Sequence, residues 1–269
     1  MGDLEEAIRV ARQAVEATSE DNLDRVAYLN NLGNKLESRY QRTGKLEDLE
    51  EAIQVAQQTV DVTSEDHPNR AACLNNLGNK FESRYEYTGK IEDLEEAIQV
   101  AQQAVDVTPE DHSNRAVCLN NLGSKLGGRY ERTGKIKDLE EAIRVARQAV
   151  NVTPGNHPDQ ARRLSNLGTQ LERRYKCTGN MKDLEEAIEL TRQAVSVTPE
   201  DHPDRAAWLN NLGNKFERRH QRTGKMEDLE ETIRLTRQAV DFTAKDHPDQ
   251  AGRLNNLGSK PALSNSGHI

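Results

Sequence analysis

Asparagine pairs recur along the chain inside a nearly constant heptapeptide, LNNLGNK. It stands at residues 29–35 and returns in similar form at 74–80, 119–125, 164–170, 209–215 and 254–260. An amide side chain donates and accepts hydrogen bonds, so a row of amides can pair with a peptide backbone whatever its sequence. Because asparagine is a mediocre helix former, its repeated use within a helix needs a reason. The pattern predicts noncovalent binding, either to a ligand or between neighbouring helices.

Histidines recur with the same 45-residue period, but their spacing does not favour a metal site. They are His67, His112, His157, His202 and His247. Metal ligands must converge on one ion at distances of about 2 Å, whereas residues one repeat apart are held well apart. We therefore expect these histidines to cap or pack the loops in which they lie.

The remaining reactive side chains give little support to catalysis. Glu50 and Glu51 are adjacent at an exposed helix start, without an apolar pocket that could raise a carboxyl pKa. Cys73, Cys118 and Cys177 lie in no recognisable nucleophile motif, and the repeated histidines offer no distinct triad partner. The sequence thus predicts a protein that is not an enzyme, with no catalytic residue, metal or cofactor.

Composition favours a thin core that is shared between neighbouring units. Of 269 residues, 30% are charged and 34% hydrophobic, fewer apolar residues than one large core would need. The net charge of -8 disfavours nucleic-acid binding through phosphates. No apolar run approaches the roughly 18 residues of a membrane span, and the start MGDLEEAIRV does not resemble a signal peptide. An odd number of cysteines without framework spacing indicates a reducing compartment, which we take as the cytoplasm.

The elements that position these residues repeat without a gap. DLEEAI, or DLEETI in the last unit, opens each 45-residue unit, a period typical of solenoids. Residues 48–63 carry one apolar stripe at helical spacing, and Asp48 with Glu51 resembles a capping box. A second stripe predicts a helix over 70–87 that ends at Gly89. The chain is therefore predicted to be all-α, built from helix hairpins.

The repeat divides residues 1–260 into one array. We expect an unpaired helix at 3–18, five hairpins, and a partial helix at 249–260. The hairpins are predicted at 22–63, 67–108, 112–153, 157–198 and 202–243. Pro261 would break the last helix, so residues 261–269 are predicted to be a disordered tail. The array looks cut at both ends, which is expected of a fragment of a longer protein.

These units resemble the tetratricopeptide repeat (TPR). The family pattern is Trp-x2-Leu-Gly-x2-Tyr, then Ala-x3-Phe-x2-Ala, then Pro. The matching residues here are Leu74, Leu77, Gly78, Phe81, Ala97, Ala101, Ala104 and Pro109. HEAT and armadillo repeats have a similar length but lack this set. The resemblance implies a right-handed superhelical solenoid of antiparallel helix hairpins. The long unit is similar to arrays of fungal proteins with a caspase-like (CHAT) protease or a nucleotide-binding switch domain.

In tetratricopeptide arrays the first helices line a concave groove, so the resemblance places the exposed asparagines on its floor. On a helical wheel these amides point about 140–160° away from the buried stripe. The candidate peptide-binding residues are Asn31, Asn34, Asn76, Asn79, Asn121, Asn166, Asn211, Asn214 and Asn256. The alternative is that the amides bond only to neighbouring helices or water.

Basic residues accompany the amides on the same predicted face. Arg162, Arg173, Arg218 and Arg222 make the C-terminal half of the floor basic, which would suit an acidic peptide or a C-terminal carboxylate. The wheel also places Lys35, Lys80, Lys125, Lys215 and the arginines at 39, 84, 129, 174 and 219 on exposed positions. The alternative is that these cations are solvated and paired with Glu37 or Glu82.

The sequence therefore favours a noncatalytic scaffold that binds a peptide or protein segment in its concave groove. Two alternatives stay open. One is a sensor or regulatory segment of a larger signalling protein whose effector domain is absent. The other is a self-assembling solenoid joined end to end.

Overall fold

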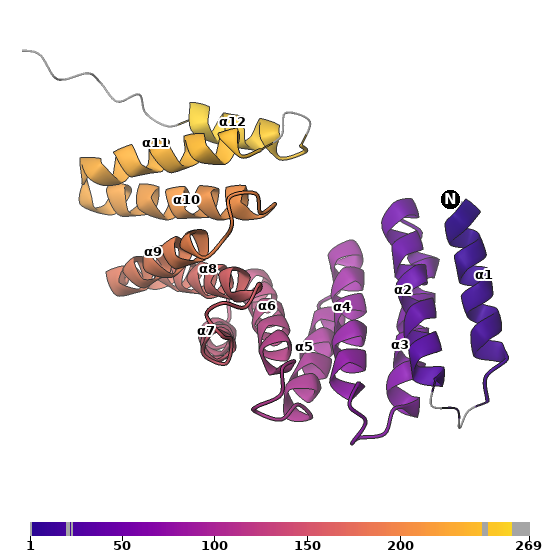
Figure 1. Cartoon of the computed structure of the whole chain (residues 1–269). Helices are drawn as coiled ribbons and strands as arrows, with labels where there is room; N and C mark the ends of the chain where they lie inside the picture. Colours follow the sequence, from indigo (N-terminus) through magenta and orange to yellow (C-terminus); the bar gives the residue numbers. More distant parts are fainter. Residues whose placement is uncertain (1, 20–21, 23, 244–246, 260–269) are drawn as a thin grey trace, which may run out of the picture. The chain divides into compact units, whose positions relative to one another are not determined.

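The computed structural model describes residues 2–19, 22, 24–243 and 247–259, and every regular element in them is an α-helix (Figure 1). The chain forms two compact units, Met1–Val152 and Thr153–Ile269, which we describe separately. The first unit holds α1 (Gly2–Glu16), α2 (Arg25–Thr43), α3 (Leu46–Val62), α4 (Arg70–Thr88), α5 (Ile91–Asp106), α6 (Arg115–Thr133) and α7 (Ile136–Asn151). The second holds α8 (Gln160–Thr178), α9 (Met181–Ser196), α10 (Arg205–Thr223), α11 (Met226–Asp241) and α12 (Gln250–Gly258).

The helices α2, α4, α6, α8 and α10 are the first helices of the five hairpins, and each packs against the second helix that follows it. A glycine directly follows each of these first helices. Gly89 has a φ of 70°, which favours glycine, and its N–H donates to the carbonyl of Tyr85 at 2.7 Å. The predicted partial helix 249–260 contains α12, whereas residue 260 and the predicted tail 261–269 lie outside the described residues.

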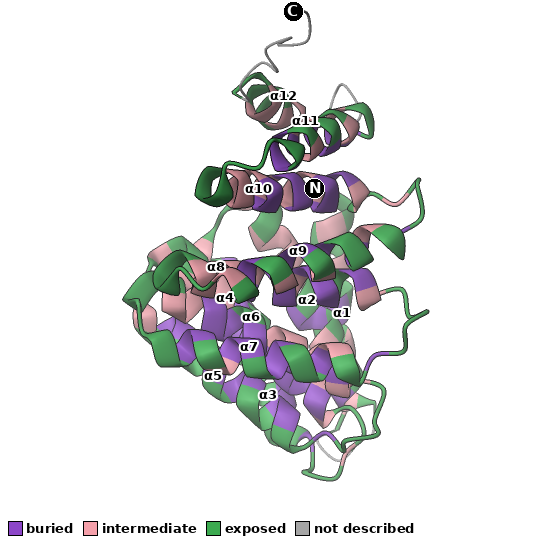
Figure 2. Ribbon diagram, turned by 90° about the vertical axis from the view of Figure 1, so that its left-hand side faces the viewer, coloured by how far each residue is buried: buried purple, intermediate pink, exposed green. Residues whose placement is uncertain are grey.

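The predicted apolar stripes form the core, as the burial colours in Figure 2 show. On α3 the stripe from Leu49 to Val60 is buried throughout, and on α4 the stripe from Ala71 to Phe81 is buried as well. Each helix therefore turns one face inward and leaves the other exposed. This packing keeps the asparagine-bearing face of every first helix at a fixed position relative to the core.

The predicted capping box is wrong, because α3 begins two residues before Asp48. Asp48 therefore lies in the first turn, where it is buried and accepts a bond from Arg39 Nη2 at 2.6 Å. The same pair recurs in every hairpin, between residues nine apart. The pairs are Arg39–Asp48, Arg84–Asp93, Arg129–Asp138, Arg174–Asp183 and Arg219–Asp228. These arginines are thus half-buried and link the two helices of each hairpin, whereas the helical wheel placed them on exposed positions.

Candidate functional site

The predicted asparagine row lies on the first helices, at intermediate depth. Asn31, Asn34 and Asn79 are exposed, and the other six predicted amides are half-buried. Those six are Asn76, Asn121, Asn166, Asn211, Asn214 and Asn256. The side chains of this row are thus exposed enough to contact a ligand. They also lie near enough to the neighbouring first helices to form hydrogen bonds between repeats.

Several of these amides do bond between repeats. Asn121 Nδ2 donates to Asn75 Oδ1 at 3.2 Å, and Asn256 Nδ2 donates to Asn210 Oδ1 at 2.9 Å. Asn76 Nδ2 reaches Asn30 Oδ1 at 3.4 Å, a longer contact. The interhelical alternative therefore holds for Asn76, Asn121 and Asn256. Contact of the row with a ligand stays a prediction.

The sequence reasoning missed the first asparagine of each pair. Asn75 is buried, accepts from Asn121, and donates through Nδ2 to Cys118 Sγ at 3.1 Å. Asn30 likewise donates to Cys73 Sγ at 3.4 Å. The recurring pair of asparagines could have indicated a role for the first one. A helical wheel of one helix, however, does not include the residues of the next repeat that lie opposite it.

Three lysines that the wheel placed on the surface are buried, so that prediction is wrong. The side chains of Lys80, Lys125 and Lys215 are only 2%, 2% and 1% exposed. Their partners lie on the first helix of the preceding repeat, and pairing with Glu37 and Glu82 is confirmed. The Nζ–carboxylate distances are 2.9 Å for Lys80–Glu37, 2.7 Å for Lys125–Glu82 and 3.1 Å for Lys215–Glu172.

The lysines of these ion pairs also bond to two of the predicted asparagines, Asn34 and Asn79. Lys125 Nζ donates to Asn79 Oδ1 at 2.9 Å, and Lys80 Nζ to Asn34 Oδ1 at 3.3 Å. An ammonium group that leaves water needs several acceptors, and the amide carbonyl supplies one. These amide oxygens are thus engaged by the neighbouring repeat.

The four predicted groove arginines differ in their surroundings. Arg218 Nε donates to Glu172 Oε1 at 2.6 Å, so it joins the buried Lys215–Glu172 pair. Arg173 is half-buried and contacts Gln170 Oε1 at 3.0 Å. The other two, Arg162 and Arg222, are exposed. Of these, Arg162 pairs with the carboxylate of Asp159 at 2.7 Å.

Glu172 predicts a pH dependence of stability in the second unit. Burial would raise its pKa, but the charges of Lys215, Lys176 and Arg218 outweigh it and hold the pKa below the usual 4.5. Since the folded state binds the proton more weakly, this stabilisation is complete above about 4.5 and is lost as pH falls through the folded-state pKa. We expect Glu172→Gln to flatten the acid limb of thermal melts. An unchanged acid limb would contradict the assignment.

A hollow lies between α10 and α12, on the face of the first helices that carries the asparagine row, which we call the amide face. Its volume is about 350 Å³, and its walls include Ala207, Asn210, Asn211, Gly252 and Asn256. Within the part of the chain that the structure describes, Asn211 makes no hydrogen bond to another residue. Its amide therefore keeps its full donor and acceptor capacity for a molecule that enters the hollow.

The loop histidines act as the sequence predicts. Each accepts a hydrogen bond through Nδ1 from the backbone N–H two residues later, as in His67 to Asn69 and His112 to Asn114, both at 3.1 Å. This bond fixes the loop before the next first helix. Among the described residues, no group of three or more His, Cys, Asp or Glu side chains is placed to hold a metal ion.

Comparison with known proteins settles the family. The model described as Tetratricopeptide repeat matches five consecutive segments, 25–69, 70–114, 115–159, 160–204 and 205–249. The chain belongs to the tetratricopeptide repeat family. Each matched segment begins at a first helix and includes the second helix and the loop after it, so the fold is an all-α solenoid of antiparallel helix hairpins.

Two solved structures share this tetratricopeptide fold. One is BtubC (BKLC) from P. vanneervenii, with a TM-score of 0.63 and 15% identity over 99% of this chain and 98% of that chain. The other shows nearly identical TPR-like repeats of a Podosopora anserina protein named after kinesin light chain. Its TM-score is 0.56, with 22% identity over 80% of this chain and 96% of that chain. At these identities the likeness shows the fold alone. None of the curated proteins compared with the sequence matches it.

No described helix of this tetratricopeptide repeat protein has both the length and the apolar character needed to cross a membrane.

Proposed function

We propose that this chain is a noncatalytic scaffold that holds a peptide or protein segment against the first helices. The observation that carries the proposal is the hollow between α10 and α12, where Asn211 and Asn256 face the same space. Asn211 has no partner among the described residues, and Asn256 Nδ2 is used whereas its Oδ1 remains available. Such amides can bond an extended backbone whatever its sequence.

Charge favours an acidic segment or a C-terminal carboxylate as the ligand. Arg162 and Arg222 are exposed on the first helices of the second unit, and Arg173 lies on the same helix as Arg162. Bonds from arginine to a carboxylate are about twice as strong as neutral ones. Arg218 contributes less to this preference, because Glu172 already accepts its Nε–H.

The test is a pair of matched substitutions. A fluorescein-labelled peptide that ends in three acidic residues and a free carboxylate serves as the probe for fluorescence anisotropy. Asn211→Ala should weaken its binding by about 0.5–1.5 kcal/mol, the value of one hydrogen bond, and leave helicity unchanged. Asn121→Ala, which breaks the bond to Asn75, should instead lower the melting temperature. The proposal fails if Asn211→Ala lowers the melting temperature and spares binding.

Compartment and context follow as parts of the same proposal. All three cysteines are free, two of them buried, which favours a reducing environment such as the cytoplasm. The sensor segment and the self-assembling solenoid remain the alternative predictions. Light scattering over a concentration series distinguishes them, because only self-assembly makes the apparent mass rise with concentration.

A further inference from the structure

The ends of the second helices carry a row of exposed apolar side chains. The row occupies one position of the repeat and comprises Val62, Val107, Val152, Val197 and Phe242, which are between 39% and 48% exposed. In each repeat the next residue is a threonine that is buried. An apolar side chain is thus exposed at the same position of five repeats, beside a buried neighbour, and apart from the positions that carry the asparagine row.

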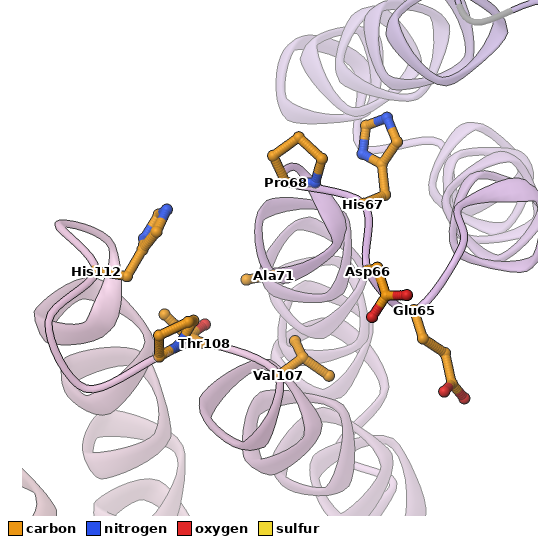
Figure 3. Close-up of a pocket in the computed structure, with 9 residues that line it drawn as sticks. Glu65, Asp66, His67, Pro68, Ala71, Val107, Thr108 and His112 are labelled. Carbon is orange, nitrogen blue, oxygen red and sulfur yellow. The ribbon is translucent and has the colours of Figure 1, made fainter.

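One member of this row forms the floor of a pocket in the first unit. The pocket has a volume of about 310 Å³ and opens between two interhelix loops. Figure 3 shows His67 and Pro68 on one side and His112 on the other, with Ala71 and Val107 between them. We call this pocket the first notch. Its size is at the lower end of small-ligand pockets, which suits one inserted side chain.

The second unit contains the same pocket, two repeats further along. Each of the nine residues that line the first notch has its counterpart 90 positions later, so that Val107 corresponds to Val197 and Pro68 to Pro158. This second notch has a volume of about 280 Å³ and is also lined by Trp208. The same nine positions of the repeat thus form a notch once in each unit.

The two notches differ in charge. Glu65 and Asp66 line the first notch, whereas Gly155 and Asn156 replace them in the second. A further acidic pair follows the second proline of each notch in the sequence, at residues 110–111 and 200–201, and Asp159 follows Pro158 in the second notch. The first notch therefore has four carboxylates on or beside its lining residues. The second has three, of which Asp159 is already paired with Arg162 and Arg163.

We propose that the first notch is a second docking site, which takes an apolar side chain flanked by lysine or arginine from a basic partner segment. Burial of that side chain against Val107, Ala71 and Pro68 supplies affinity. The carboxylates of Glu65 and Asp66 select the positive flanks and repel acidic ones. This surface lies at the loops, is chemically opposite to the basic side of the amide face, and serves a different ligand.

The direct test measures binding of a labelled peptide in which one leucine is flanked by two lysines on each side. Val107→Ser should weaken binding about tenfold, since it removes an apolar contact without adding a charge. Val197→Ser is the matched control in the second notch and should leave binding unchanged. Both valines are well exposed, so the fold tolerates the change, and circular dichroism checks this. Equal loss in both variants would overturn the proposal, as would no binding at about 1 mM peptide.

Charge is tested separately by two reciprocal variants. Glu65→Lys with Asp66→Lys should abolish binding of the lysine peptide and allow binding of its glutamate counterpart. Gly155→Glu with Asn156→Asp installs the acidic pair in the second notch, where a Cβ on Gly155 would meet no atom within 4 Å. Titration calorimetry should then report two bound peptides in place of one. The proposal is wrong if the Glu65→Lys, Asp66→Lys variant binds the lysine peptide as the natural sequence does. It is also wrong if the Gly155→Glu, Asn156→Asp variant still binds one peptide.

Trp208 provides an independent readout. It is the only tryptophan in the chain, lines the second notch, and stacks on His202 with ring centroids 5.3 Å apart. The peptide should leave tryptophan emission unchanged in the natural sequence and alter it in the Gly155→Glu, Asn156→Asp variant. An emission change in the natural sequence would place the peptide in the wrong notch. If Asn211→Ala abolished binding of the lysine peptide, the peptide would instead bind on the amide face. Each of these two results contradicts the proposal.

Discussion

Replacing Glu172 with alanine should destabilise the second unit by about 3–5 kcal/mol, because it leaves a buried charge without its counter-ion. Lys215 is 1% exposed, and its Nζ lies 3.1 Å from Glu172 Oε2. Burial lowers the pKa of Lys215, which means that its charged form is held there mainly by Glu172. Lys176 and Arg218 also lie near that carboxylate, so its removal adds repulsion among three cations.

Urea unfolding followed by circular dichroism measures this loss, with two controls. Glu189→Ala removes the carboxylate of an exposed pair with Arg192 and should cost less than about 1 kcal/mol. Glu172→Met with Lys215→Met removes both buried charges and should recover most of the stability, since well-packed apolar residues often replace buried ion pairs at little cost. A single Glu172→Ala variant as stable as Glu189→Ala would refute the argument.

Helices and core were predictable because their signals are local to the chain. The three-four spacing of Leu49, Ala52 and Ile53 needs only the geometry of one helix, and all three are buried as expected. The family pattern around Leu77 and Gly78 likewise predicted the hairpin solenoid. These features follow from residues fewer than one repeat apart.

The burial and the partners of the charged and amide side chains could not be predicted in this way. A wheel of α6 alone places Lys125 toward water, because it does not include Glu82 and Asn79 on the preceding first helix. Lysine has a long stem, so its ammonium reaches a partner that the neighbouring repeat supplies. Asn75 was missed for the same reason. The candidate site thus depends on contacts between residues more than 40 positions apart, which periodicity indicates only as a repeat.

Two glycine-to-alanine substitutions should change stability in opposite directions. A Cβ on Gly168 would lie 2.9 Å from Thr191 Oγ1 and 3.2 Å from the carbonyl oxygen of Ala187. Neither atom can yield easily, because Thr191 is fully buried and bonded to that same carbonyl at 2.8 Å. The close approach of α8 to α9 therefore requires glycine. On α6, by contrast, a Cβ on Gly128 meets nothing within 4 Å.

We expect Gly168→Ala to lower the free energy of unfolding by about 1–2 kcal/mol, because overpacking outweighs the better helix propensity of alanine. Gly128→Ala should gain about 0.5–1 kcal/mol, because it reduces the entropy of the unfolded chain without a clash. Urea unfolding of the two variants measures both changes. Thr191→Ala in the Gly168→Ala background should relieve part of the loss, since it removes the nearest atom. Stabilisation by both single substitutions would show that α8 and α9 can move apart freely, and would contradict the close contact at Gly168.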